Sequence, residues 1–168
     1  HRLFKSGQYS LDKVMPSLAP SMDIQVASNF ERLLYYFLDC DTSKVVEVMS
    51  TFREEGKYSF DAFEIKGFSS VSADDSEIPK LIKMVKDKYA YLVDPHTACA
   101  FKDLDQQKRA VILATAHPAK FPAVYERAGM EIPVSSTLEK LKIVEPKSYK
   151  VSVDSLSIRS FILENISQ

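Results

Sequence analysis

The sequence predicts an α/β fold that is mostly helical and contains a few buried strands. Two observations support this prediction. In several stretches, apolar residues recur at the spacing of one helical face, which is typical of helices packed on a core. The run from Val111 to Leu113 is continuously apolar and β-branched at two of three positions, which indicates a strand buried on both faces.

The composition restricts the function classes. The chain has 168 residues, of which 45% are hydrophobic, enough for one core and a small subdomain. Its net charge of −1 argues against a nucleic-acid or membrane-surface partner, and no apolar run approaches the ~20 residues of a membrane span. Cys40 and Cys99 lack metal-ligand spacing, so we predict no metal site and a reduced, cytoplasmic protein.

The first third of the chain predicts two helices. His1 to Gly7 is typical of a last helical turn ended by glycine, and residues 8–20 indicate a connecting segment. Ser28 and Glu31 have the spacing of a capping box in front of an apolar helix over residues 30–38. Because Tyr35 and Tyr36 widen its apolar surface almost all the way round, we expect this helix to be deeply packed.

Two further helices follow. Ser43 is a candidate cap for a helix that Gly56 would end. Residues 58–68 predict a short helix or turn, and residues 68–73 a brief extended piece. Another helix starts at Ser76, with Pro79 in its first turn and lysines on its solvated face.

The remaining elements are shorter. Asp94 and Pro95 open a helix, because the carboxylate accepts backbone N–H groups that have no partner in the first turn. Residues 105–109 predict a polar turn before the strand at 111–113. Towards the end we expect a short helix over 136–142 and an edge strand of Tyr149, Val151 and Val153. Asp154 would cap a last helix whose inward residues are Ile158, Phe161, Ile162 and Ile166.

A candidate site follows the predicted strand. Thr115, His117 and Lys120 come directly after it, and Pro118 would begin a helix over residues 119–127. In open α/β sheets, ligands bind at the carboxyl ends of the strands, so a hydroxyl, an imidazole and an ammonium here indicate a binding site. The alternative is that Thr115 and His117 cap the helix and Lys120 is solvated.

Three separated stretches resemble threonine synthases of the yeast-like branch, which are pyridoxal-phosphate (PLP) enzymes of fold type II. They are Ala114 to Pro122, Ser21 to Leu34 and Tyr91 to Ala98. The resemblance runs from His1 to about Arg127. It implies a carboxyl-terminal portion of a longer polypeptide, which agrees with a start that lacks an initiator methionine.

The resemblance also implies a division of the chain. Residues 1–40 would belong to the large PLP domain, 41–90 to a helical small subdomain, 91–130 to the cofactor edge of the large domain and 131–168 to a carboxyl-terminal extension. The role of that extension, and the oligomeric state, are left open by the sequence.

The resemblance assigns roles to several residues. Thr115 would contact the pyridine nitrogen of the cofactor. The imine lysine and the phosphate loop would precede this segment, so we predict no catalytic residue in the chain. Lys120 would support the site as an ion-pair partner of Asp94. Asp94, with His96 and Thr97, would lie beside the cofactor, with helix capping as the alternative, and His117 would make either a structural hydrogen bond or a proton transfer.

The implied activity is conversion of O-phospho-L-homoserine and water into L-threonine and phosphate, a step of amino-acid biosynthesis. Its partners would be this small-molecule substrate and the remainder of the same polypeptide, and the segment alone would be inactive. One alternative is a threonine synthase-like phospho-lyase that releases a 2-keto acid. Another is a non-catalytic module that docks through the aromatic surface of residues 30–38, although their spacing is that of a buried helix.

Overall fold

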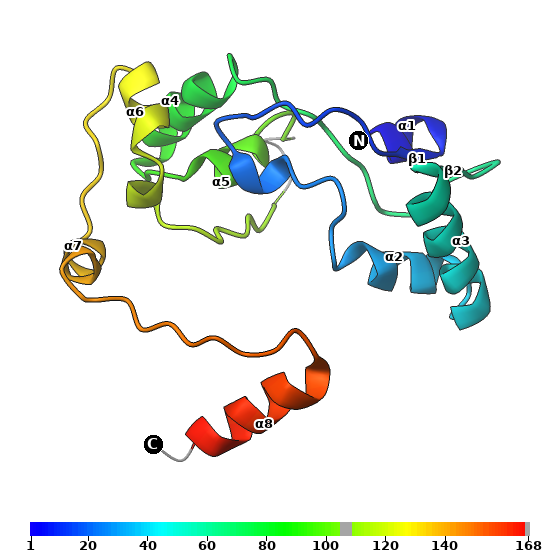
Figure 1. The fold of residues 1–168 in the computed structure, drawn as a ribbon. Helices are drawn as coiled ribbons and strands as arrows, with labels where there is room; N and C mark the ends of the chain where they lie inside the picture. Colours follow the sequence, from blue (N-terminus) through cyan, green and yellow to red (C-terminus); the bar gives the residue numbers. More distant parts are fainter. Residues whose placement is uncertain (105–108, 167–168) are drawn as a thin grey trace. The chain divides into compact units, whose positions relative to one another are not determined.

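The computed structural model describes residues 1–104 and 109–166. The predicted fold class is confirmed, because this part of the chain is mostly helical with one small two-stranded sheet (Figure 1). The contacts between residues divide the chain into two compact units, His1–Pro133 and Val134–Gln168. The elements are α1 (Arg2–Ser6), β1 (Gln8–Ser10), η1 (Pro20–Met22), α2 (Phe30–Phe37), α3 (Thr42–Glu55), β2 (Lys57–Ser59), α4 (Ile78–Tyr89), α5 (Pro95–Cys99), η2 (Pro118–Lys120), α6 (Pro122–Arg127), α7 (Ser136–Lys142) and α8 (Ser155–Asn165).

One core of the first unit surrounds the small sheet. Strands β1 and β2 pair antiparallel, with Tyr9 opposite Tyr58. The Tyr9 ring stacks on Phe52 with centroids 3.9 Å apart. The sequence does not predict this sheet, because residues 8–20 indicate a connecting segment and residues 58–68 a short helix or turn. The buried residues of this core are Leu3, Leu34, Val48, Met49, Phe52 and Phe63.

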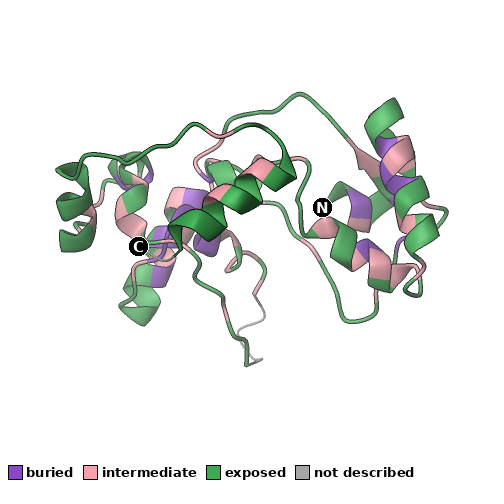
Figure 2. Ribbon diagram, turned by 60° about the horizontal axis from the view of Figure 1, so that its bottom comes forward, coloured by how far each residue is buried: buried purple, intermediate pink, exposed green. Residues whose placement is uncertain are grey.

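A second core lies where helices α4, α5 and α6 pack together. Helix α4 contacts both of the others, and the buried positions of the three helices are purple in Figure 2. Tyr125 and Ile82 are fully buried here. This core matters for function because the candidate site lies on it. Its buried members are Ala19, Ile78, Ile82, Val85, Val93, Ala98, Val124 and Tyr125.

Most predicted helix ends are confirmed, although two caps differ. Gly7 and Gly56 end α1 and α3 in the left-handed conformation, with φ of 72° and 71°. Helix α3 is capped by Asp41 rather than Ser43, because the Asp41 carboxylate accepts the Ser43 N–H at 2.9 Å. The predicted capping box of Ser28 and Glu31 before α2 is wrong. The N-cap residue of α2 is Asn29, which makes no side-chain capping bond.

Helix α2 is less deeply packed than its composition predicts. Leu34 is its fully buried residue, while Tyr35 is half-buried and the Tyr36 side chain is 67% exposed. The expectation of packing on all sides is therefore wrong for Tyr36. Phe30, Phe37 and Leu38 are half-buried against the first core, so the helix is amphipathic and buries one face.

The predicted strand over 111–113 is wrong. Val111 and Leu113 are 89% and 78% exposed, with Ile112 half-buried between them. No strand pairs with this segment within the described residues. A strand needs a neighbour for its backbone N–H and C=O groups, so an apolar run alone does not form one. Residues 68–73, expected as a brief extended piece, belong to no helix or strand. The predicted turn at 105–109 falls largely outside the described residues.

The predicted helix over 119–127 is divided in two. A 3-10 turn, η2, precedes α6, and Phe121 lies between them with φ −129° and ψ 60°. Pro122 explains the break, because a proline ring disfavours helical geometry in the residue before it.

The second unit contains helices α7 and α8. Asp154 caps α8 as predicted, since its carboxylate accepts the Ser157 N–H at 2.7 Å. The predicted edge strand at residues 149–153 is wrong, because these residues have no strand structure. The prediction that one face of α8 is buried is also wrong, since Ile158, Ile162 and Ile166 are exposed. In both units together, no helix among the described residues has the length and apolarity to cross a membrane.

Candidate functional site

The site begins at the amino end of α5. Asp94 is buried and caps the helix, with Oδ1 accepting the backbone N–H groups of His96 at 3.0 Å and Thr97 at 3.4 Å. The proline at the first helical position needs no such partner. The predicted helix opening at Asp94 and Pro95 is therefore confirmed.

Three buried polar side chains, Asp94, His96 and Thr97, form a buried polar cluster at this helix end. The imidazole Nδ1 of His96 lies 2.8 Å from Asp94 Oδ1. The Thr97 hydroxyl donates to Asp94 Oδ2. Both carboxylate oxygens are thus occupied within α5 itself. Burial tends to raise the pKa of Asp94, but the hydrogen bonds from Thr97 and His96 outweigh it and leave the pKa below its ordinary value.

The partner of the second ring nitrogen identifies the tautomer of His96. The backbone N–H of Ser21 points at Nε2 over 3.0 Å. Because an amide N–H only donates, Nε2 must carry a lone pair, and the proton of the neutral ring is on Nδ1, facing Asp94. His96 therefore connects η1 to α5, which lie side by side in Figure 1.

The segment before Thr115 lies beside this helix. Ile112 and Thr97 line the same cavity, which has a volume of about 310 Å³ and mainly apolar walls. This cavity lies against the second core, because Val85 and Val93 belong to both. The residues just before the motif stretch Ala114–Pro122 therefore lie next to α5.

Thr115, His117 and Lys120 lie on the surface. All three side chains are exposed. His117 caps η2, with Nδ1 accepting the Ala119 N–H at 3.1 Å, so its structural hydrogen bond is confirmed. The backbone N–H of Lys120 closes the same turn on the His117 carbonyl. The proposed ion pair of Lys120 with Asp94 is not found among the described residues, because the Asp94 carboxylate is occupied by His96 and Thr97.

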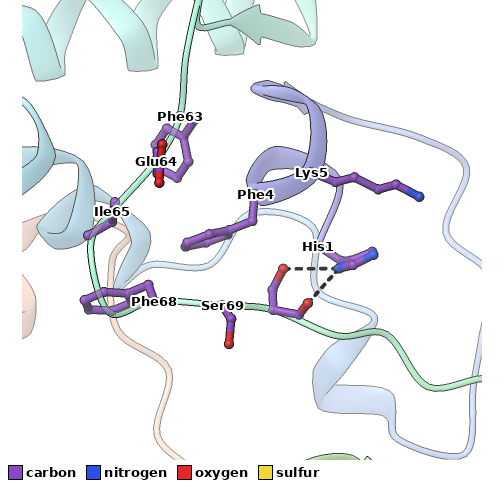
Figure 3. A pocket seen from close by; sticks show the side chains of 9 residues that line it. His1, Phe4, Lys5, Phe63, Glu64, Ile65, Phe68 and Ser69 are labelled. Carbon is purple, nitrogen blue, oxygen red and sulfur yellow. Dashed lines mark hydrogen bonds between the residues drawn. The ribbon is translucent and has the colours of Figure 1, made fainter. Parts of the chain in front are cut away.

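A larger cavity lies in another part of the first unit. It has a volume of about 460 Å³ and lies between α1 and residues 63–70 (Figure 3). Phe4 and Phe63 meet edge to face on one side, and His1 bonds to Ser70 on the other. None of the predicted site residues line it. Within the described residues, no three His, Cys, Asp or Glu side chains gather to hold a metal ion.

Sequence reasoning did not find the contact between Ser21 and His96. The two residues are 75 positions apart, and neither spacing nor periodicity connects them. The signal that could have suggested it is chemical, since a histidine two residues after a capping aspartate can bond back to that aspartate and point its other nitrogen away from the helix.

Comparisons with known proteins identify the family. A family profile described as "Threonine synthase, C-terminal" matches residues 95–162. Threonine synthase from Pseudomonas aeruginosa is 37% identical over 139 residues, covering 77% of this chain and 30% of that protein. The chain belongs to the threonine synthase family. It corresponds to the carboxyl-terminal region of that family, as its resemblance implies.

Solved threonine synthases have the same fold. The PLP-bound enzyme from Brucella melitensis matches with a TM-score of 0.73 and 29% identity, covering 97% of this chain and 37% of that one. The yeast enzyme matches with a TM-score of 0.71 and 29% identity, covering 99% and 40%. The chain thus spans about a third of the length of the threonine synthases that it resembles.

Proposed function

We propose that this chain is the carboxyl-terminal portion of a PLP-dependent threonine synthase that converts O-phospho-L-homoserine and water into L-threonine and phosphate. The match to the PLP-bound threonine synthase from Brucella melitensis over nearly the whole chain carries this proposal. The substrate would be a small molecule, and the remainder of the same polypeptide would complete the site. We further propose that the protein acts in the cytoplasm, which suits its two free cysteines.

Thr115 fits one of the anchors that PLP needs. Its hydroxyl is exposed on the segment beside α5, so it is accessible to a ring nitrogen. When bound, PLP supplies an electron-withdrawing ring that eases loss of a proton and of phosphate. A hydroxyl partner would hold the ring in place without fully protonating its nitrogen.

The other anchors belong to the remainder of the polypeptide in this proposal. An imine-forming lysine is normally desolvated, and no lysine that the structure describes is buried. The four glycines are widely separated, at positions 7, 56, 67 and 129, so they form no phosphate loop. We therefore expect the segment alone to be inactive, with residues 1–40 and 91–130 belonging to the PLP domain, 41–90 to the small subdomain and 131–168 to an extension.

The remaining predicted residues would support the cofactor rather than react with it. Asp94 would act through His96 and Thr97, because both of its oxygens are occupied. His117 would shape the turn after Thr115 through its bond to Ala119. Lys120, exposed at the end of that turn, would place a positive charge near the site.

A phospho-lyase that releases a 2-keto acid is the second candidate. The chain is also similar to human "Threonine synthase-like 2", which is 30% identical over 143 residues, covering 77% of this chain, and whose name does not state a product. Both candidates share the loss of phosphate, and they differ in whether water is then added to the carbon skeleton.

One assay separates the candidates. The intact protein is given O-phospho-L-homoserine and PLP, and threonine and 2-oxobutyrate are measured separately. Threonine as the main product supports the proposal, and 2-oxobutyrate supports the phospho-lyase. Absence of both products would favour the non-catalytic module.

A second experiment tests the cofactor residues. We expect T115V to weaken PLP binding about tenfold, the effect of one lost hydrogen bond, while T115S keeps the hydroxyl and stays close to wild type. Borohydride trapping of a stable adduct on Lys120 would contradict the assignment, because the imine lysine is expected elsewhere in the polypeptide.

A further inference from the structure

The three stretches that resemble threonine synthases meet at one buried side chain, His96. It belongs to the stretch Tyr91–Ala98, and its Nδ1 faces Asp94. Its Nε2 accepts the backbone N–H of Ser21 in the first stretch. Its ring also packs edge to face on Phe121 of the third stretch, with centroids 4.8 Å apart and planes at 67°.

The hydrogen bonds of His96 favour one tautomer of the neutral ring. Asp94 holds the proton on Nδ1, and the lone pair on Nε2 is then aimed at Ser21. Burial of His96 and Asp94 strengthens both hydrogen bonds, because water does not compete for them. The contact fixes the backbone of η1, while the Ser21 side chain remains exposed on that turn.

We propose that His96 is a positioning residue that fixes η1 so that the Ser21 hydroxyl can hold the polar substrate. This inference rests on the proposed function and names a substrate-binding residue for it. His96 itself touches no substrate, since both ring nitrogens are occupied by Asp94 and Ser21. Ala19, which precedes the turn, is buried in the second core, so the turn is anchored at its start by packing and at Ser21 by the imidazole.

Nuclear magnetic resonance of the intact protein, labelled with nitrogen-15 in histidine and serine, tests the anchor without reference to activity. We expect a proton on Nδ1, a bare Nε2 and a scalar coupling between Nε2 and the Ser21 amide nitrogen. The signal is assigned by its loss in H96N. A ring protonated on Nε2, or a Ser21 amide without coupling, would overturn the proposal.

Two matched variants test the positioning role. In H96N, the side-chain amide lies near the former position of Nδ1, so the acceptor for the Ser21 N–H is lost. In H96Q, the longer side chain places an oxygen near the former position of Nε2, so that acceptor is kept. We expect H96N to raise the KM for O-phospho-L-homoserine about tenfold with kcat within about twofold, and H96Q to restore most of the KM. If the substitutions simply unfolded the protein, H96N and H96Q would be impaired alike. An equal loss of kcat in both variants would overturn the proposal.

A double variant separates an effect through Ser21 from one that bypasses it. S21A should raise KM by a similar factor, and adding H96N to S21A should change KM little further, because residues that act through one contact are not additive. Additive effects would overturn the proposal. A protein that makes no threonine would overturn the proposed function, while the coupling would still report whether His96 holds Ser21.

Discussion

The hydroxyl of Tyr125 donates a hydrogen bond of 2.7 Å to the backbone carbonyl of Val93. Both residues are buried, and they are 32 positions apart. Tyr125 belongs to α6, which follows the stretch containing Thr115, and Val93 immediately precedes Asp94. The bond therefore holds the two parts of the candidate site together. Burial, and then the nearby charge of Asp94, raise the pKa of Tyr125, so the hydroxyl stays a donor.

Y125F should destabilise the protein without changing its helix content. It removes the donor and leaves the buried Val93 carbonyl without a partner, which costs about 1–3 kcal/mol. The measurement is the free energy of unfolding from urea denaturation. Y36F is the matched control, because the Tyr36 side chain is mostly exposed, and we expect no measurable change. Equal stability of Y125F and wild type would show that the hydrogen bond contributes little.

Asp94 should make stability depend on pH in the acid range. Its pKa in the folded protein lies below the ordinary value of 3.8, despite burial, because Thr97 and His96 bond to the charged form. The charged carboxylate therefore stabilises the fold at all pH values above the ordinary pKa. This stabilisation is lost as the pH falls through the lower folded pKa.

The variant D94N isolates this effect. At about pH 6 we expect it to be about 2 kcal/mol less stable than wild type, the scale of hydrogen bonds to a charged group. The difference should shrink as the pH falls towards about 3. Urea denaturation across this range is the measurement, with D87N as control because the Asp87–Lys83 pair is exposed. A constant difference at every pH would refute the role of the Asp94 charge.

The helices could be predicted because their signals are local. Asp94 caps α5, Asp154 caps α8 and Gly56 ends α3, and in each case the cap and the helix are neighbours in sequence. Ser43 and Asp41 show the limit of this reasoning. Both residue types accept backbone N–H groups, and only the geometry of the turn decides which one caps α3.

The strands and the polar contacts of the site could not be predicted, because they depend on distant partners. Val111–Leu113 has strand composition, yet no neighbouring strand is available among the described residues. Tyr9 and Tyr58 do pair, although their neighbours in the sequence are polar. Likewise, the motif around Asp94 indicates a cap, but only the folded chain shows that His96 reaches Ser21.

Gly7 and Gly56 offer a matched test of backbone strain. Both have φ near +70°, so alanine at either position should cost about 1 kcal/mol for the left-handed conformation. At Gly7, an added Cβ would also lie 2.6 Å from the Phe60 carbonyl oxygen, whereas at Gly56 nothing lies within 4 Å. We therefore expect G7A to be clearly less stable than G56A in urea denaturation. Similar losses would mean that the chain around Phe60 moves away at little cost.

The two cysteines should differ in reactivity. Cys40 is exposed, whereas Cys99 is half-buried and its thiol donates to the Pro95 carbonyl at 3.2 Å. Burial raises the pKa of Cys99 and so lowers the fraction of reactive thiolate. Under native conditions, iodoacetamide should modify Cys40 at least about tenfold faster than Cys99, measured by mass spectrometry of digested samples. In C40S the remaining labelling should be slow until urea unfolds the protein, and rapid labelling of Cys99 in folded C40S would show that α5 opens readily around Cys99.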